Sequence, residues 1–212
     1  MNYFVTGASG FIGRRLVEKL LQQPDATVYY LILERELPMV ATLGRRWGEA
    51  AARTVPIIGD LTQPHLGVAD ADLARLKGNI QHLFHLAAVY DLKASAEIQE
   101  KVNIQGTRNA VAFAEAIEAG CFHQTSSIAA AGLYEGVFRE DMFDEAEELD
   151  NPYYRTKHES EGIVRRECTR PWRIYRPGAV VGDSRTGEMD KIDGPYYFFK
   201  LIQKARRLLP PW

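Results

Sequence analysis

A glycine-rich turn behind a short apolar run constrains the fold of this chain more than any other feature. Residues 3–5 are apolar, Gly7, Gly10 and Gly13 follow at three-residue spacing, and apolar residues then recur with helical periodicity. This pattern predicts a strand, a tight turn and a helix. Glycines let the backbone approach a pyrophosphate closely, and the free amide groups of the helix amino terminus favour that anion. An ordinary β-to-α connection is the alternative.

Strand and helix patterns alternate along the remaining sequence, without repeats or low-complexity segments. This alternation predicts an α/β fold, a Rossmann-like doubly wound parallel sheet, in one domain spanning residues 1–212. Ligands of such sheets bind at the carboxyl ends of the strands. The further strands are predicted at 27–33, 54–58, 80–86, 122–125 and 172–175, and the helices at 39–52, 70–77, 95–119, 152–168 and 196–208.

Composition narrows the function classes. A formal net charge of −2 argues against binding to nucleic acid. The two cysteines, Cys121 and Cys168, lack metal-ligand spacing, so we expect free thiols and no metal site. No apolar run reaches the roughly 20 residues of a membrane span. Met1 leads into a strand pattern without a signal-peptide layout, so a cytoplasmic protein is expected.

The sequence Asn151-Pro152 predicts the start of a helix, because Asn is a favoured N-cap and Pro suits the first helical position. Tyr153 and Lys157 then lie one turn apart on the same face. An ammonium near a phenol favours the phenolate, so Tyr153 is suited to donate or accept a proton. Taken alone, this spacing is more often a surface pair.

The end of the second predicted strand bears on cofactor choice. A carboxylate there binds the ribose hydroxyl of NAD, whereas an arginine accommodates the phosphate of NADP. Glu34 and Arg35 stand side by side, so both chemistries are present. Arg14 and Arg15, just past the glycine turn, also suit a phosphate. Solvated surface charges are the alternative for Arg14, Arg15 and Arg35.

Other strand ends carry candidate ligand contacts. Asp60 suits an adenine amino group, or else forms an Asx turn. Ala87 and Ala88 are small enough to admit a dinucleotide to the sheet. Ser126 and Ser127 place hydroxyls at the predicted ligand crevice, with an ST-turn as the alternative.

Two polar residues fall inside predicted elements. His85, in the fourth predicted strand, is expected as a core histidine with satisfied hydrogen bonds. Asn103, inside the long predicted helix, faces either solvent or the interior, where it would need hydrogen-bonding partners.

Together and in this order, these motifs resemble the extended short-chain dehydrogenase/reductase superfamily. They are the glycine turn, residues 60–61, 85–88, 103–107 and 126–127, Tyr153-x-x-x-Lys157 and Arg176-Pro177. Residues 89–91, 138–143, 157–161 and 187–199 resemble, more narrowly, the amino-terminal domain of bacterial fatty acyl-CoA reductases, which make fatty alcohols.

The resemblance implies catalytic roles. Tyr153 would donate a proton to the carbonyl oxygen, Ser127 would donate a hydrogen bond to it, and Lys157 would hold the ribose and favour the phenolate. Asn103 would support the lysine through water. Tyr90 and Ser126 are expected to contact substrate.

The resemblance also implies a set of cofactor contacts. NADPH is the first choice, but NADH stays open because Leu33 stands where close relatives usually carry arginine. Pro177 would lie beside the nicotinamide amide. The expected cofactor contacts are Gly7, Ser9, Gly10, Phe11, Ile12, Gly13, Arg14, Glu34, Arg35, Asp60, Leu61, Ala87, Ala88, Lys157 and Pro177.

The implied activity is reduction of a fatty acyl thioester, on CoA or acyl carrier protein, or of a fatty aldehyde towards fatty alcohol. Alternatives are a sugar-nucleotide epimerase or dehydratase, another extended short-chain reductase, and a non-catalytic dinucleotide-binding module or fragment. The non-catalytic alternative is considered because members of the extended superfamily continue into a seventh strand and a substrate-binding lobe, which these 212 residues do not include. A homo-oligomer is compatible with the resemblance.

Overall fold

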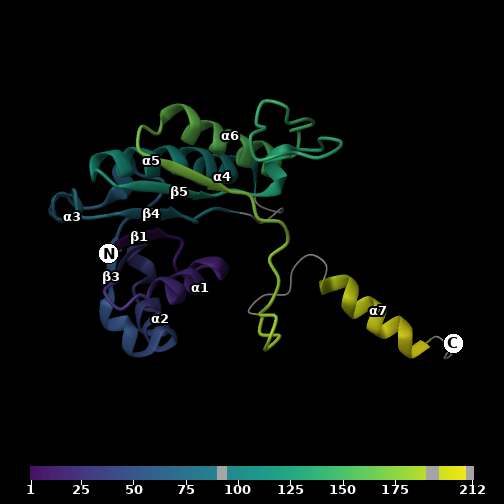
Figure 1. Cartoon of the computed structure of the whole chain (residues 1–212), viewed down its shortest axis with the longest axis horizontal. Coiled ribbons are helices and arrows are strands. Elements are labelled where there is room, and N and C mark those ends of the chain that lie inside the picture. The colour runs from purple at the N-terminus through teal and green to yellow at the C-terminus, as the bar shows by residue number, and fades with distance from the viewer. Residues whose placement is uncertain (90–94, 190–195, 209–212) are drawn as a thin grey trace. The chain divides into compact units, whose positions relative to one another are not determined.

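The computed structural model describes residues 1–89, 95–189 and 196–208 in two compact units, Met1–Arg176 and Pro177–Trp212 (Figure 1). The first unit is built on a parallel sheet of six strands in the order β3-β2-β1-β4-β5-β6. This order confirms the predicted Rossmann-like doubly wound sheet. The strands are β1 Asn2–Thr6, β2 Thr27–Ile32, β3 Thr54–Ile58, β4 His82–His85, β5 Cys121–Thr125 and β6 Trp172–Tyr175.

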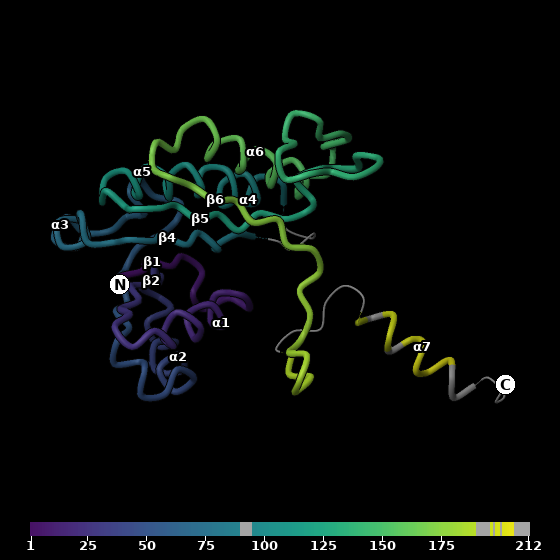
Figure 2. The backbone as a smooth tube through the Cα atoms, viewed as in Figure 1, coloured from purple at the N-terminus to yellow at the C-terminus, as the bar shows by residue number. Residues whose placement is uncertain are grey.

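Helices pack on both faces of this sheet, as the backbone trace also shows (Figure 2). Successive strand residues point to opposite faces, so fully buried Phe4 and Val5 contribute to two separate apolar cores. The core around Val5 lies under α1 (Phe11–Leu20) and α2 (Met39–Trp47). The core around Phe4 includes residues of α3 (Asp70–Leu76), α5 (Gly106–Ala116) and α6 (Pro152–Glu167). The short helix α4 (Ala96–Gln99) precedes α5 along the chain.

Two long predicted helices are interrupted. The helix predicted at 39–52 stops at Trp47, because Gly48 adopts a left-handed φ of +58°. The helix predicted at 95–119 begins as expected, with the Ser95 hydroxyl accepting from the amide of Ile98 at 3.3 Å. It then widens into a π-helical segment, Glu100–Gln105, before α5. Single π turns often occur at functional sites.

The second unit contains the predicted helix α7, Tyr196–Leu208. Before it, one carboxylate oxygen of Asp183 accepts from the amides of Arg185 and Thr186, both at 2.9 Å, which forms a turn. No helix among the described residues is long and apolar enough to cross a membrane. The expected single-domain organisation stays a prediction.

Candidate active site

The glycine turn between β1 and α1 is too tightly packed for larger side chains at two of its positions. Gly7 has a φ of +74°, and a Cβ on it would lie 2.7 Å from the backbone nitrogen of Ala87. A Cβ on Gly13 would lie 1.9 Å from the carbonyl oxygen of Gly7. Gly10 caps α1 without a side chain and is itself exposed. The open amide groups at this helix start suit a pyrophosphate, so the turn fits the expected cofactor.

The other residues of the turn lie around this helix start. Ser9, Phe11 and Arg14 are half-buried, and Ile12 is exposed. The structure brings half-buried Ala87, which follows β4, to the glycine turn, and the next residue, Ala88, is exposed. Cofactor contacts by these residues stay predictions.

Two predicted nucleotide contacts follow β2. Glu34 and Arg35 lie in a single 3₁₀ turn, Glu34–Glu36, and both side chains are exposed. An anionic and a cationic group therefore flank the end of this strand, as the sequence indicated. Neither nicotinamide cofactor is favoured by their placement.

The predicted adenine-pocket residues have structural partners. One carboxylate oxygen of Asp60 accepts from the amide and the hydroxyl of Thr62, at 2.8 and 2.9 Å, which is the Asx-turn alternative. Leu61 is buried against Gly106, where a Cβ would lie 2.7 Å from the leucine Cγ. Their contact with adenine stays a prediction.

His85 is a core histidine with two hydroxyl partners, as expected. The Thr107 hydroxyl donates to the carbonyl of Asn103 at 2.6 Å, so it accepts from His85 Nε2 at 3.1 Å. His85 Nδ1 then accepts from the Thr6 hydroxyl at 2.8 Å, and that oxygen accepts from the Ala87 amide at 3.2 Å. Burial lowers the pKa of His85 to about 3, so the ring is neutral. This network fixes the end of β4 beside the glycine turn.

Asn103 faces the interior and is 2% exposed. Its amide exchanges two hydrogen bonds of 2.8 Å with the backbone of Val89 and donates to the Thr156 hydroxyl at 3.3 Å. The main-chain carbonyl oxygen of Asn103 accepts from the Ser160 hydroxyl at 2.9 Å. Asn103 thus ties the segment after β4 to α6. Its water-mediated link to Lys157 stays a prediction.

Sequence reasoning missed the supporting residues of α6. Thr156 and Ser160 are both buried and stand four residues apart, so they share the face that meets Asn103. That spacing of small polar residues was the available signal. It was ambiguous, because the same pattern also occurs on solvated faces.

The predicted pair on α6 is formed. The Asn151 side chain accepts from the amide of Tyr153 at 2.9 Å, which confirms the N-cap. Lys157 Nζ lies 6.0 Å from the centroid of the Tyr153 ring and donates to the carbonyl of Thr125 at 3.5 Å. Lys157 is 7% exposed. Burial lowers the pKa of its ammonium to about 8, and Glu161 partly opposes this shift.

The two serines after β5 have different surroundings. Ser127 caps a short 3₁₀ helix, Ile128–Ala131, by accepting from the amide of Ala129 at 3.1 Å. This bond uses a lone pair and leaves the hydroxyl hydrogen for another acceptor. Ser126 is 4% exposed and donates to Glu161 at 2.6 Å. Ser126 thus supports Glu161, and its contact with substrate stays a prediction.

A buried ion pair lies beneath these serines. Glu161 is fully buried and accepts from Arg176 in three hydrogen bonds of 2.7 to 3.2 Å. The same guanidinium donates to the carbonyls of Arg139 and Met142 at 3.2 and 2.9 Å. The pair thus joins α6, the end of β6 and the connector before α6. Sequence reasoning included Arg176 only as part of a motif and did not identify its partner.

Two predicted site residues cannot be placed beside these groups. Tyr90 lies outside the described residues. Pro177 belongs to the second unit. Their contacts with substrate and nicotinamide stay predictions.

The NAD-binding family model described as "Male sterility protein" matches residues 5–210. The chain belongs to the male sterility protein family. This membership confirms both the extended short-chain dehydrogenase/reductase resemblance and an NAD-type cofactor, which the glycine turn fits.

Similar proteins include a peptide synthase, a protein named as a fatty acyl-CoA reductase and an R domain of a PKS-NRPS pathway. A linear gramicidin synthase of Brevibacillus parabrevis is 34% identical over 204 residues, which is 89% of this chain and 4% of that protein. A Drosophila melanogaster protein named for fatty acyl-CoA reductase activity is 31% identical over 133 residues, covering 55% of this chain and 26% of that protein. The terminal R domain from the myxalamid PKS-NRPS biosynthetic pathway superposes with a TM-score of 0.82 at 28% identity, covering 99% of this chain and 56% of that one.

The chain therefore spans little more than half of the R domain and far less of the two whole proteins. Membership of the male sterility family makes it part of an oxidoreductase family. The narrower resemblance to fatty acyl-CoA reductases holds only in part, because the gramicidin synthase and the R domain match over more of the chain.

Proposed function

We propose that this chain binds NADPH and supplies the proton-donating groups of a reductase that acts on an acyl thioester and on the resulting aldehyde. The observation that carries this proposal is the buried ammonium of Lys157, 6.0 Å from the ring centroid of Tyr153 on one face of α6. A desolvated cation beside a phenol suits proton transfer to a carbonyl oxygen.

The proposed substrate class follows from the relatives. Acyl-CoA is a thioester, and one relative is named for its reduction. The gramicidin synthase and the R domain extend the proposed class to acyl or peptidyl groups on a carrier protein. The acyl carrier, CoA or protein, is therefore the proposed partner.

When bound, the nicotinamide supplies a hydride to the carbonyl carbon. In our proposal, the Tyr153 hydroxyl gives its proton to the carbonyl oxygen, and the Ser127 hydroxyl stabilises the charge that develops there. From a thioester, the hydroxyl proton of the resulting adduct would pass to the sulfur as the carbon–sulfur bond breaks, which releases the thiol and the aldehyde. Reduction of the aldehyde to the alcohol would use a second molecule of NADPH, and Tyr153, reprotonated from solvent, would again donate its proton to the carbonyl oxygen. Lys157, with a pKa of about 8, stays charged at neutral pH.

Replacing Tyr153 with Phe tests this role, and the neighbouring Tyr154 provides the matched control. NADPH oxidation is followed with decanoyl-CoA and with decanal, and NADPH binding is measured separately by fluorescence titration. We expect Y153F to lower turnover by about 10²–10⁴-fold while NADPH affinity stays close to that of the wild type. Y154F should change neither quantity. Normal turnover in Y153F, or epimerisation of a sugar nucleotide without thioester reduction, would refute the proposed function.

We further propose, from the resemblance to fatty acyl-CoA reductases and not from the placement of Glu34 and Arg35, that NADPH is preferred over NADH. Arg35 is exposed directly after β2, where a ribose phosphate would be recognised, and its neighbour Glu34 is the matched control. R35A should weaken NADPH binding by about tenfold and leave NADH binding nearly unchanged. E34A should not weaken NADPH binding. Equal affinity of the wild type for both cofactors would contradict this preference.

A further inference from the structure

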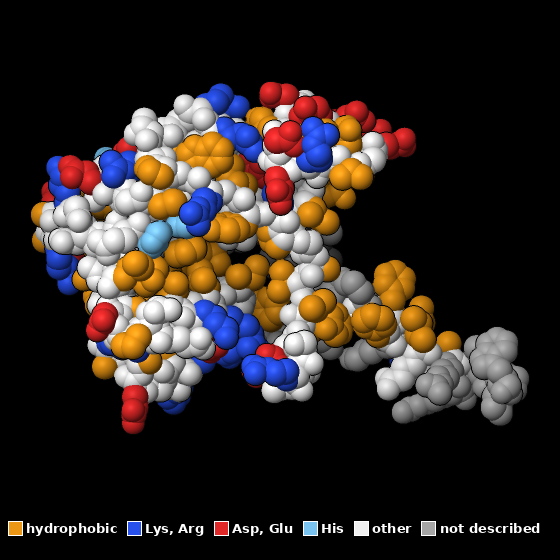
Figure 3. Space-filling model, viewed as in Figure 1, with side chains coloured by type: hydrophobic (Ala, Val, Ile, Leu, Met, Phe, Trp, Pro, Cys, Tyr) orange, Lys and Arg blue, Asp and Glu red, His pale blue; other side chains and the backbone are white. Residues whose placement is uncertain are grey.

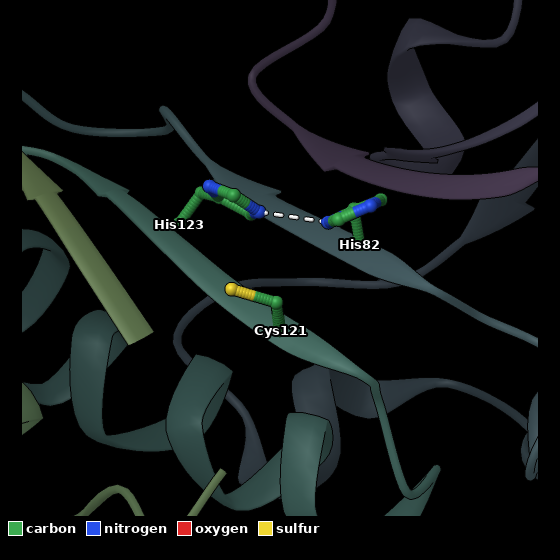
Figure 4. A group of neighbouring side chains, drawn as sticks. All are labelled: His82, Cys121 and His123. Atoms are coloured by element: carbon green, nitrogen blue, oxygen red, sulfur yellow. Dashed lines mark hydrogen bonds between the residues drawn. The ribbon is translucent and has the colours of Figure 1, made fainter. Parts of the chain in front are cut away.

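Two histidines and a cysteine meet at the start of β4 and β5. His82 Nδ1 lies 3.0 Å from His123 Nε2, and one ligand atom from each of His82, Cys121 and His123 lies within 4.8 Å of the other two. The rings of the two histidines point toward one another, and the cysteine sulfur lies beside them (Figure 4). Imidazole nitrogen and thiolate sulfur are the donors that Zn²⁺ prefers in proteins.

Strand register brings these residues together. His82 is paired with Cys121 between β4 and β5, and His123 is two residues further along the same face. His82 and Cys121 are half-buried, and His123 is 3% exposed. Histidine side chains reach the surface among hydrophobic ones over these strands (Figure 3). An ion therefore has a route to the cluster.

We propose that His82, Cys121 and His123 form a Zn²⁺ site with three protein ligands. This inference does not depend on the reductase function. His82 and Cys121 are the first residues of β4 and β5, whereas Thr125, at the other end of β5, contacts Lys157. Along β5, Cys121 is four residue steps from Thr125, or about 13 Å, and His123 is two steps from it, or about 7 Å.

The cluster needs only a small adjustment to hold the ion. Tetrahedral zinc places two nitrogen ligands about 3.3 Å apart and a nitrogen and a sulfur about 3.6 Å apart. The 3.0 Å nitrogen pair therefore opens slightly, and the atoms that lie up to 4.8 Å apart close by about 1 Å. Side-chain rotation is sufficient for such shifts. The fourth position stays open to water.

A neighbouring residue already holds one ligand ring in place. The hydroxyl of Tyr175 lies 2.9 Å from His123 Nδ1, and the two rings stack with centroids 5.9 Å apart. Metal-binding histidines commonly use their second ring nitrogen for such a hydrogen bond. In the zinc form, His123 Nδ1 donates to Tyr175 and Nε2 binds the ion.

One nearby charge opposes a dication. Arg173 is paired with His123 in the register of β5 and β6, and it acts electrostatically on His82, Cys121 and His123. Deprotonation of the cysteine on binding offsets part of this repulsion. Replacing Arg173 with Gln should therefore tighten zinc binding.

Cobalt substitution tests the site directly. The reduced chain is stripped of metal with EDTA and titrated with Co²⁺, whose absorption reports both a tetrahedral site and a thiolate ligand. We expect one ion per chain, a thiolate-to-cobalt band and displacement by Zn²⁺. C121S should lose that band and bind Zn²⁺ at least about tenfold more weakly. C168S, the matched control, should keep both properties.

Two further measurements distinguish a loss of metal binding from a loss of folding in a variant. The metal-free melting temperature of each variant is compared with the wild type, and H82N should weaken zinc binding independently of the cysteine. Zinc should raise the melting temperature of the wild type but not that of C121S. Absence of one-to-one binding, or an unchanged cobalt spectrum in folded C121S, would overturn the proposal.

Discussion

Strand β4 carries a histidine at each end, and the two differ in their surroundings. At the carboxyl end, His85 is 3% exposed and lies between two threonine hydroxyls from β1 and α5. At the amino end, His82 is half-buried, and its ring lies beside His123 and Cys121. The first histidine is part of a scaffold with defined donors and acceptors. The second belongs to a cluster in which the contact between His82 and His123 would be replaced by bonds to an ion in the proposed zinc form.

This difference separates two kinds of polar chemistry on one sheet. At the carboxyl edge, buried polar groups come from different elements and satisfy one another, so removing one leaves a buried partner unsatisfied. At the amino edge, the same three side chains can hold either a proton or an ion between them. We therefore expect the carboxyl edge to tolerate substitution poorly and the amino edge to tolerate it well.

The largest effect is expected at the glycine turn. Gly13→Ala places a Cβ 1.9 Å from the carbonyl oxygen of Gly7, so backbone must move. We expect a loss of at least about 5 kcal/mol in the free energy of unfolding, or failure to fold. Gly44→Ala is the control, because its Cβ would meet only Ala51 at 4.0 Å and alanine favours a helix by up to about 1 kcal/mol. Denaturant titration measures both, and a wild-type midpoint for G13A would contradict the close packing.

The buried ion pair comes next. Glu161→Gln leaves Arg176 facing a neutral group, which should cost about 3–5 kcal/mol. Glu159→Gln, on the same helix, removes a half-exposed pair with Arg155 and should cost less than about 1 kcal/mol. Urea unfolding of the two variants gives the comparison. Equal losses would mean that burial does not distinguish the two pairs.

Lys157 should give stability a distinctive dependence on pH. Its folded pKa is lowered from 10.5 to about 8, so below pH 8 both states are charged and the cost of burial is present in full. Between pH 8 and 10.5 the folded state loses its proton first, and stability rises with pH. From pH 8 to 9.5 the gain is about 1.5 kcal/mol relative to Lys157→Met. Parallel pH profiles of the two proteins would contradict this assignment.

Local signals in the sequence predicted much of the fold. β3 at Thr54–Ile58, β6 at Trp172–Tyr175 and α7 at Tyr196–Leu208 match the predicted bounds, because apolar runs and turn residues mark their ends. The start of α6 followed from Asn151 and Pro152. The break in the helix after Ser95 was missed, because the π-helical segment depends on contacts of Asn103 with Val89 and α6.

The candidate site was predictable where its residues share a helix or a turn. Tyr153 and Lys157 stand on one helix, so spacing alone indicated their proximity. Glu161 and Arg176 belong to different elements, and only the packed fold pairs them. The cluster of His82, Cys121 and His123 was likewise missed, because pairing between β4 and β5 brings these residues together and their spacing within each strand gives no signal. The expectation of no metal site followed from this omission.

The smallest change in the free energy of unfolding is expected at the amino edge of the sheet. Variants at the two ends of β5 make the comparison direct. In EDTA, Cys121→Ser should change the free energy of unfolding by less than about 1 kcal/mol, since the residue is half-buried and the replacement has nearly the same shape. Ser126→Ala, just past the other end of β5, removes a donor from fully buried Glu161 and should cost about 1–3 kcal/mol. Urea unfolding measures both changes. If C121S lost more stability than S126A, the amino edge would be part of the rigid scaffold, and rearrangement around an ion would be correspondingly harder.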